Sequence, residues 1–413
     1  MHFSSQRSRR LRRAALLVAG LGAVTSSAPA LVTIGDPAVH LIAPTPASAD
    51  PGWRRTGGDG IYIGHGWMIT AGHTGFGGGA TIDGGFYDAY LGSDIRLRTL
   101  DGAGDTDLRM YRLKSSPPLP AINVIDTSLA PGTAVTLIGS GLRRGAAVKY
   151  DAAWHLNGTP VAYTGFLFGT EIGVKSWGTN RITSGVDYDD GYGMARCYTA
   201  DFTAPGSGST ATADETLIAV GDSGGSMWAS VVGEWRLAGV LIDLGVLPGQ
   251  NWGEAAIHGD WTYAVDLAPY RPQIDALLAL STPYEFWQYK NFRGTPTAAT
   301  ADPDGDGFTN LEEYAYGLDP KAKNPRSAAP QIGLSTYADG RALTATFTRY
   351  NFAYDTPVVV EVSEDLVTWR NGPGATITLT ILEPHTPVQA FVVRDATPST
   401  GANRRFMRVR VAR

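Results

Sequence analysis

The sequence has very little cysteine: Cys197 is the only one in 413 residues, so no disulfide can form within the chain. A chain of this length can bury a large core instead, because disulfides are needed mainly by small exported domains. No neighbouring residue in the sequence supplies a base for the Cys197 thiol. We therefore expect a small buried apolar side chain at this position rather than a nucleophile.

An excess of basic residues is also absent. The chain carries 34 Lys and Arg against 39 Asp and Glu, a formal net charge of -5. This balance excludes the basic stripe of a nucleic-acid-binding protein, so we expect no nucleic-acid partner. Hydrophobic residues make up 43% and charged residues 18%, which is enough apolar material for real cores. The length predicts two or three domains, and the 51 glycines predict the many turns of a mainly β protein.

After residue 24 the chain has no apolar run long enough to cross a bilayer. Before that point, five arginines between residues 7 and 13 precede the apolar run Ala14–Val24, and small residues follow. This pattern predicts an export signal over residues 1–30, with cleavage after Ala30 or, alternatively, after Ala49. An arginine-rich tail that stays attached is the other interpretation. We expect an exported protein, whether extracellular, periplasmic or at the cell surface.

Short apolar runs separated by Gly, Pro, Asn and Asp recur from about residue 59 to residue 240. Such runs predict the short strands of a sandwich or barrel. Helix-like recurrence over Ala264–Leu280 then predicts a strand end and a helix that closes the domain. Arg293–Ala301 has the composition of a linker, and β-type runs return from Gln331 to the end, which predicts a second, smaller β domain. The strongest expected strands cover residues 61–70, 108–113, 134–138, 217–220, 236–242, 342–348, 357–362, 376–382, 388–393 and 406–411.

Three segments carry the residue types of nucleophilic catalysis. An apolar strand ends directly before His73, Asp107 begins a strand-like run, and Ser223 stands in the segment Gly221–Gly225. A serine hydroxyl needs a base to become a nucleophile, and it needs a tight turn whose N–H groups converge on the developing oxyanion. Flanking glycines allow such a turn. A surface Gly-Ser turn is the alternative, which the apolar runs on both sides disfavour.

In this chain order the three segments resemble the chymotrypsin–trypsin family of serine peptidases. The family pattern Thr-Ala-Ala-His stands here as Thr70-Ala71-Gly72-His73, and Gly-Asp-Ser-Gly-Gly is unchanged at residues 221–225. The resemblance covers about residues 58 to 280. It implies a trypsin-like double β-barrel with a C-terminal helix over residues 50–283.

The resemblance also implies a serine-type endopeptidase acting on protein or peptide substrates. His73, Asp107 and Ser223 would form its catalytic triad, and the N–H groups of Gly221 and Ser223 its oxyanion hole. No segment resembles the new amino terminus that activates trypsin, so the acid Asp222 must be satisfied in another way and no zymogen step is implied. The position that corresponds to trypsin's specificity carboxylate is Leu217, which predicts cleavage after apolar or small residues.

A calcium site is predicted in the linker, which we assign to residues 284–325. Acids at the first, third and fifth positions, glycine at the sixth and glutamate at the twelfth supply the hard oxygens that Ca²⁺ prefers. Thr309 and Glu312 form a capping box for a short helix that ends near Gly317. The segment resembles EF-hand-like and thrombospondin type 3 repeats of exported bacterial proteins, and an acidic turn without an ion is the alternative. The expected ligands are the carboxylates of Asp302, Asp304, Asp306 and Glu313 and the carbonyl of Phe308.

Residues 326–413 are predicted to form a small β-sandwich-like domain. Val359–Trp369 and the ending Arg405–Val409 resemble C-terminal β domains of large secreted bacterial proteins. No catalysis is inferred there, and a cell-surface ligand is the expected kind of partner. A second reading of the whole chain is therefore a calcium-stabilised surface-binding protein whose peptidase-like domain is inactive. The intact set of triad residues argues against that reading.

Overall fold

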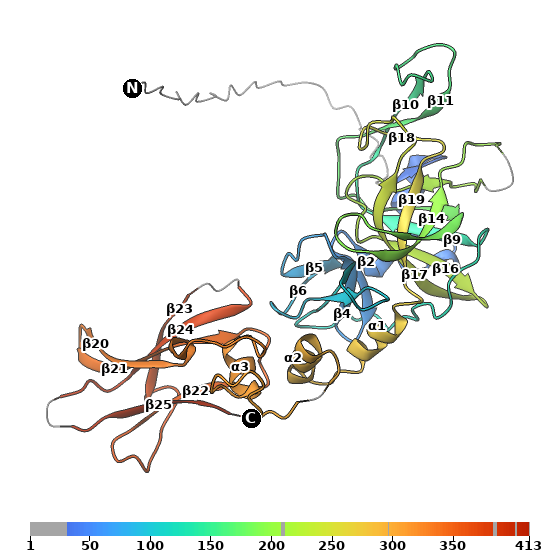
Figure 1. Ribbon diagram of the computed structural model, residues 1–413. Coiled ribbons are helices and arrows are strands. Elements are labelled where there is room, and N and C mark those ends of the chain that lie inside the picture. The colour runs from blue at the N-terminus through green and yellow to red at the C-terminus, as the bar shows by residue number, and fades with distance from the viewer. Residues whose placement is uncertain (1–30, 208–210, 296, 383–385, 401–402, 413) are drawn as a thin grey trace, which may run out of the picture.

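The computed structural model describes residues 31–207, 211–295, 297–382, 386–400 and 403–412, and it is mainly β, as the sequence predicts. Strands of the N-terminal half and strands of the C-terminal half form separate groups, with helices α2 and α3 between them (Figure 1). The predicted export signal lies outside the described residues. No helix in the described ranges is long and apolar enough to cross a membrane.

The first sheet of the N-terminal half carries the histidine and aspartate segments. The run predicted as one strand over residues 61–70 forms two strands, because the chain turns at His65 and Gly66, which both have positive φ. A separate hairpin, β5 and β6, follows the histidine. The strands, in sheet order, are β2 (Thr56–Gly57), β3 (Gly60–Gly64), β4 (Trp67–Ala71), β8 (Asp105–Arg112) and β7 (Ile95–Arg98); the hairpin is β5 (Gly79–Ile82) and β6 (Gly85–Asp88).

The second sheet carries the serine segment, and all of its neighbouring strands are antiparallel. In order it contains β12 (Ser176–Arg181), β9 (Ala134–Gly139), β16 (Ser226–Val231), β17 (Glu234–Gly245), β19 (Trp261–Asp266), β14 (Ala195–Asp201) and β13 (Ser184–Tyr188).

The two edge strands of the second sheet, β12 and β13, are consecutive in the chain and are joined by a bend at Ile182 and Thr183. Ile182 N–H donates to Thr133 beside β9, whereas Thr183 N–H donates to Thr199 on β14. The sheet therefore curls until a single bent strand passes from one edge to the other. Among the described strands no hydrogen-bonded ladder closes the ring, so the predicted barrel is a strongly curled open sheet.

Residues 31–49 are part of the fold. Leu31 and Val32 have no exposed surface, and the Leu31 N–H donates to Ser176 Oγ at 2.8 Å. Strand β1 (Val32–Thr33) pairs with β15 (Thr216–Leu217), shortly before the serine segment. A further small sheet projects from the second one and contains β10 (Arg144–Tyr150), β11 (Tyr163–Phe168) and β18 (Ala255–Ile257).

Two of the helices match their sequence signals, and one was not predicted. Helix α1 (Arg271–Leu278) follows β19, as expected. Helix α3 (Asn310–Tyr316) begins with the Thr309–Glu312 capping box and ends at Gly317, whose φ is 73°. Helix α2 (Pro283–Phe292), in the expected linker region, has a capping box of its own between Thr282 and Glu285.

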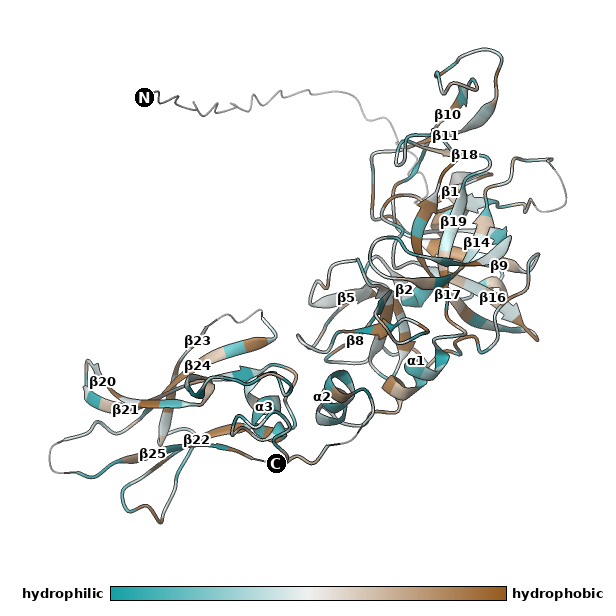
Figure 2. Ribbon diagram, in the orientation of Figure 1, coloured by the Kyte–Doolittle hydropathy of each residue, from teal (hydrophilic) through white to brown (hydrophobic). Residues whose placement is uncertain are grey.

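The C-terminal half consists of two antiparallel sheets around an apolar core, which confirms a sandwich-like arrangement. Side chains from both sheets, including Phe347 and Val360, form this core. Hydrophobic segments also gather on inner strands of the N-terminal half, such as β8 and β17 (Figure 2). The C-terminal strands are β20 (Gln331–Tyr337), β21 (Gly340–Tyr350), β24 (Val388–Asp395) and β23 (Thr376–Leu382) in one sheet, and β22 (Val358–Ser363) and β25 (Phe406–Val411) in the other.

The two halves share one apolar core through an aromatic junction. Phe286 on α2 lies 5.8 Å from the Trp67 ring of the first sheet and 5.2 Å from Phe352, measured between ring centroids. The Tyr350 hydroxyl donates to the Gly92 carbonyl at 2.5 Å. Phe352 is fully buried and belongs to the same cluster as the N-terminal sheets. The core therefore crosses the linker region, and the domain boundaries predicted near residues 283 and 325 stay predictions.

Candidate active site

The His73 ring and the Asp107 carboxylate are joined by a hydrogen bond. Antiparallel pairing of Ala71 with Leu108 places the next residues, Gly72 and Asp107, side by side. Gly72 N–H donates to the Asp107 carbonyl at 3.1 Å, and His73 N–H donates to Asp107 Oδ1 at 2.7 Å. His73 Nδ1 lies 2.7 Å from Asp107 Oδ2. Because an ionised carboxylate only accepts, Nδ1 of the neutral ring carries the hydrogen and Nε2 keeps its lone pair.

The surroundings of His73 favour its protonated ring. The hydrogen bond to Asp107 raises the pKa of His73 above its ordinary value; burial opposes this increase, and the negative charges of Asp107, Asp190 and Asp243 add to it. Asp107 has no exposed surface, and 19% of the His73 side chain is exposed. A buried carboxylate beside the ring is suited to stabilise an imidazolium during proton transfer.

Gly72, where the family pattern has alanine, is explained by its neighbours. A Cβ at this position would lie 2.8 Å from the Arg96 guanidinium and 2.9 Å from Asp107 Oδ1. Arg96 Nη2 in turn donates to Asp107 Oδ1 at 3.3 Å. The glycine therefore leaves room for Arg96 beside Asp107, a neighbour that the sequence analysis did not identify.

A loop between β13 and β14 also reaches the histidine, and no pattern in the sequence predicts this contact. Asp190 Oδ2 lies 3.7 Å from His73 Nδ1, and the Tyr192 ring lies 5.0 Å from the His73 ring between centroids. Arg96 Nη2 donates to the Tyr192 carbonyl at 2.5 Å. No local motif marks these residues, because their role depends on a contact between distant parts of the chain.

The turn that carries Ser223 packs against the end of β4. Gly221 and Gly224 have φ values of 92° and 86°, in the region that favours glycine. A Cβ at Gly224 would overlap Thr70 Oγ1. The serine turn therefore contacts the strand that ends next to His73.

The Ser223 hydroxyl donates to the Ile242 carbonyl on β17 at 3.1 Å. No hydrogen bond joins Ser223 to His73 in the part of the chain that the structure describes. The structure therefore brings two of the predicted catalytic residues together as a bonded pair and sets the third on the turn beside their strand. Catalytic hydrogen bonds are often loose without substrate, so this arrangement is compatible with a triad.

The two predicted oxyanion donors have no acceptor within the described protein. The N–H groups of Gly221 and Ser223 make no hydrogen bond to any described residue, whereas the N–H groups around them are bound. An oxyanion hole requires N–H groups next to the nucleophile that are free to donate to the substrate oxygen. The bound neighbours are Asp222 to Ala219, Gly224 to Leu241, and Gly225 to Asp222.

The acid before the serine is held by the backbone. Gly141 N–H donates to Asp222 Oδ1 at 2.6 Å, and Ala219 N–H donates to Oδ2 at 2.7 Å. Burial nevertheless raises the pKa of Asp222 to about 7. Among the described residues, the partners that satisfy Asp222 are therefore backbone N–H groups.

Leu217 is not at an open surface. It lies on β15 opposite Val32 and is fully buried in the main core. Its side chain offers no surface to a substrate in this structure. The cleavage preference predicted from Leu217 therefore gains no support and stays a prediction.

The acidic loop before α3 has a shape suited to a cation. Oxygens of Asp302, Asp304 and Asp306 lie within 4.8 Å of one another. Asp302 Oδ1 accepts from Gly305 N–H at 2.8 Å, and Phe308 N–H donates to Asp306 Oδ1 at 2.8 Å. The structure thus gathers the three aspartates, with Phe308 next in the loop.

Two carboxylate oxygens, Asp304 Oδ2 in the loop and Glu313 Oε2 on α3, are buried without a hydrogen-bond partner in the described residues. Glu313 has no exposed surface. Burial, together with the charges of the three aspartates and Asp319, raises the pKa of Glu313 to about 8. Unpaired buried carboxylate oxygens are costly, and a hard divalent cation would satisfy them, so the donor set fits Ca²⁺.

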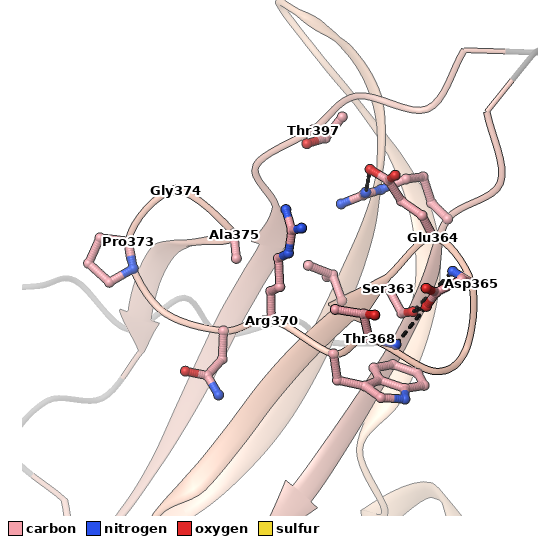
Figure 3. A pocket seen from close by; sticks show the side chains of 13 residues that line it. Ser363, Glu364, Asp365, Thr368, Arg370, Pro373, Gly374, Ala375 and Thr397 are labelled. Carbon is pink, nitrogen blue, oxygen red and sulfur yellow. Dashed lines mark hydrogen bonds and ion pairs between the residues drawn. The ribbon is translucent and has the colours of Figure 1, made fainter.

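A cavity of about 590 Å³ lies in the C-terminal half, between the ends of β22 and β23. Arg370 extends into its middle, and Glu364 is paired with Arg405 at its rim (Figure 3). No histidine or cysteine lines this cavity. Its two acids are already engaged, Glu364 with Arg405 and Asp365 with Ser363 and Thr368, so the candidate active site remains the one around His73.

No protein-family model matches the chain, and no curated protein matches it. Among solved structures, the NS6 protease from murine norovirus 1 is 15% identical, with a TM-score of 0.29, over 52% of this chain and 90% of that one. Rv3671c from M. tuberculosis, in an inactive mutant form, is 14% identical, with a TM-score of 0.31, over 54% and 82%. Human heparin binding protein is 13% identical, with a TM-score of 0.34, over 54% and 86%. TM-scores this low do not define a family, so the activity must be inferred from the site itself.

Proposed function

We propose that the protein is a serine-type endopeptidase in which His73, Asp107 and Ser223 act together. One observation carries this proposal. The buried Asp107 carboxylate accepts from His73 Nδ1 at 2.7 Å, beside a glycine-flanked serine turn. Two N–H groups of this turn have no acceptor among the described residues. The bond leaves Nε2 as the base, and the turn supplies the nucleophile and the anion-binding donors. These are the parts that peptide hydrolysis through an acyl-enzyme requires.

In the proposed reaction Ser223 Oγ attacks the scissile carbonyl while His73 Nε2 takes the hydroxyl proton. The carbonyl oxygen becomes an oxyanion and accepts from the N–H groups of Gly221 and Ser223. The C–N bond then breaks, and the protonated His73 passes its proton to the leaving amine. Water attacks the acyl-enzyme in the same way and releases the acid and the free serine.

A serine-reactive fluorophosphonate probe tests the proposal. The Ser223 oxygen would displace fluoride at phosphorus and lose its proton, so the parent protein should gain the mass of one probe less HF, and Ser223→Ala should gain nothing. Ser115→Ala, which changes an exposed serine outside the site, should label like the parent. Equal labelling of parent and Ser223→Ala, or no labelling of either, would reject the proposal.

The alternative, a calcium-stabilised surface-binding protein with an inactive peptidase-like domain, is favoured by one observation. Ser223 Oγ bonds to the Ile242 carbonyl rather than to His73. If the parent fails to label although its fold is intact, this alternative gains support. A peptide-library digest of an active parent would also reveal whether cleavage follows apolar or small residues.

The calcium, export and targeting roles belong to the same proposal. Asp302, Asp304, Asp306, Glu313 and the Phe308 carbonyl would hold Ca²⁺, which would stiffen the region between the two halves of the chain. Burial of Leu31 and Val32 supports export with cleavage near Ala30 rather than after Ala49. The C-terminal sheets would bind a cell-surface ligand.

A further inference from the structure

The loop between β13 and β14 brings a second carboxylate to the histidine. Asp190 Oδ1 accepts from Tyr192 N–H at 2.9 Å, which fixes the side chain. Asp190 Oδ2 is buried without a hydrogen-bond partner in the described residues and lies 3.7 Å from His73 Nδ1. Only 3% of the Asp190 side chain is exposed. A buried carboxylate oxygen without a donor is costly unless a cation faces it, and the nearby imidazole becomes that cation when it is protonated.

The loop is held against the site at several points. Arg96 Nη2 donates both to Asp107 Oδ1 and to the Tyr192 carbonyl, at 3.3 Å and 2.5 Å, so one guanidinium ties the loop to the catalytic acid. Gly193 has φ of 131°, and a Cβ there would overlap the Asp105 carbonyl. The approach of Asp190 to His73 is therefore part of the packing.

Asp190 is one of three carboxylates whose charges act on the His73 ring. Negative charges come from Asp107 on β8, Asp190 on the loop and Asp243 on β17, while Arg96 on β7 opposes them. Asp243 Oδ2 accepts from the Tyr188 hydroxyl at 2.6 Å, which ties up one of its oxygens. Burial, and the nearness of Asp107, raise the pKa of Asp190 to about 6. Asp190 is therefore ionised in the pH range in which His73 must act as a base, and it becomes neutral below that range.

We infer that Asp190 is a positioning residue for His73, a second carboxylate that faces the same ring nitrogen as Asp107 and shares the charge of the protonated ring with it. The inference rests on the proposed function, since it describes the control of that function's base. It implies an active site in which one imidazole faces two acids, with Arg96 and Tyr192 holding the second acid in place. It also implies two effects of acidification on the base. His73 itself takes up a proton, and protonation of Asp190 removes a charge that raises the pKa of His73.

Removal of the Asp190 charge should lower the pKa of His73. An opposite charge within about 4 to 6 Å typically shifts a pKa by ~1 unit or more, so the rise of kcat/KM with pH should move about one unit lower. The plateau at high pH should fall by roughly threefold to tenfold, because one pKa unit corresponds to about tenfold in imidazolium stabilisation. A merely structural loss would lower activity without moving the pH midpoint.

The test compares Asp190→Asn with Asp187→Asn. Asparagine keeps an oxygen for Tyr192 N–H and removes only the charge, and Asp190→Ser is a second variant without the charge. Asp187 lies on the same hairpin, with 68% of its side chain exposed and an ion pair to Arg196, so its variant controls for the loss of a carboxylate that does not contact His73. NMR of the His73 ring in a Ser223→Ala background gives the pKa without activity, and pH profiles of kcat/KM are measured in the active chain.

A lower His73 pKa in both Asp190 variants, with Asp187→Asn unchanged, is the expected result. An unchanged His73 pKa in folded Asp190 variants would overturn the inference even if the parent is an active peptidase. If the Asp190 variants lower the His73 pKa but the parent never labels with the probe, the proposed function is rejected instead. All titrations are run with and without EDTA, because His73, Asp107 and Asp190 lie within 4.8 Å of one another, and a shift seen only without EDTA would point to a bound metal and also overturn the inference.

Discussion

Gly141 N–H donates to Oδ1 of Asp222 at 2.6 Å, and so joins two residues that are 81 positions apart in the chain. Ala219 satisfies the other oxygen, so the acid next to the nucleophile is held without a free amino terminus. The intact mature protein should therefore react with a fluorophosphonate without prior cleavage. Intact-mass spectrometry would show a single adduct on the uncut mature chain. Labelling that appears only after limited proteolysis would contradict this expectation.

Replacing the catalytic acid should affect turnover much more than folding. In Asp107→Asn an amide faces His73 Nδ1 and can stabilise the wrong tautomer, so kcat should fall by about 10⁴-fold. Asp88→Asn changes an exposed acid on β6 and should keep parental rates. Steady-state kinetics, with circular dichroism to check the fold, make the comparison. Similar rates for Asp107→Asn and the parent would show that His73 does not depend on this acid.

The pH dependence follows from the raised pKa of His73. Only the neutral ring can act as the base, so kcat/KM should increase with pH through a midpoint above ~6.5, the ordinary histidine value. The same shift stabilises the fold fully below about pH 6.5, and this contribution is lost as the pH rises through the folded-state pKa. Initial rates between pH 5 and 9 at constant ionic strength test the activity limb. A flat profile would be inconsistent with a histidine base.

Calcium should stabilise the chain. At a hundredfold excess of free ion over Kd, binding to the folded loop adds ~2.7 kcal/mol, so EDTA should lower the thermal midpoint and speed proteolysis between the two halves. Differential scanning calorimetry with and without Ca²⁺ measures the shift. An identical midpoint in both conditions would argue for an acidic turn without an ion.

The calcium effect should depend on the carboxylates whose oxygens are buried without partners. Asp304→Asn and Glu313→Gln should each remove most of the response to Ca²⁺. Glu234→Gln, at the exposed start of β17 in the N-terminal half, should respond like the parent. Calorimetric titration of the parent and the three variants with Ca²⁺ separates loss of calcium binding from general loss of stability.

The mature amino terminus should lie at or before Leu31. Strand β1 pairs with β15, and Leu31 and Val32 are fully buried, so a chain that begins at Asp50 would lose part of its core. Mass spectrometry of the exported protein identifies the first residue. A stable, active product that begins at Asp50 would show that residues 31–49 are dispensable.

The sequence was most informative where chemistry requires local patterns. The turn around Ser223 needs glycines at fixed positions, and the expected positive φ values occur at Gly221 and Gly224. The capping box of α3 was also read correctly, because it depends on two residues three positions apart. The same signal before α2, at Thr282 and Glu285, could have revealed that helix.

Features that depend on distant contacts could not be predicted. Asp190 acquires its role only because the β13–β14 loop reaches His73, and Arg96 only because β7 pairs with β8. The strand expected over residues 217–220 ends at Leu217, because the chain turns so that Asp222 can accept from Ala219. Apolar patterning correctly predicts burial for such a run, but it does not show which backbone groups a later carboxylate will bind.

The junction formed by Phe286, Trp67 and Phe352 makes the C-terminal half part of the same apolar core as the N-terminal half. Each half buries apolar side chains of the other, so separating the two halves would expose apolar surface on both fragments. An N-terminal half produced without the C-terminal half would therefore tend to aggregate. A soluble version would need polar residues on the apolar surface that Phe352 now covers.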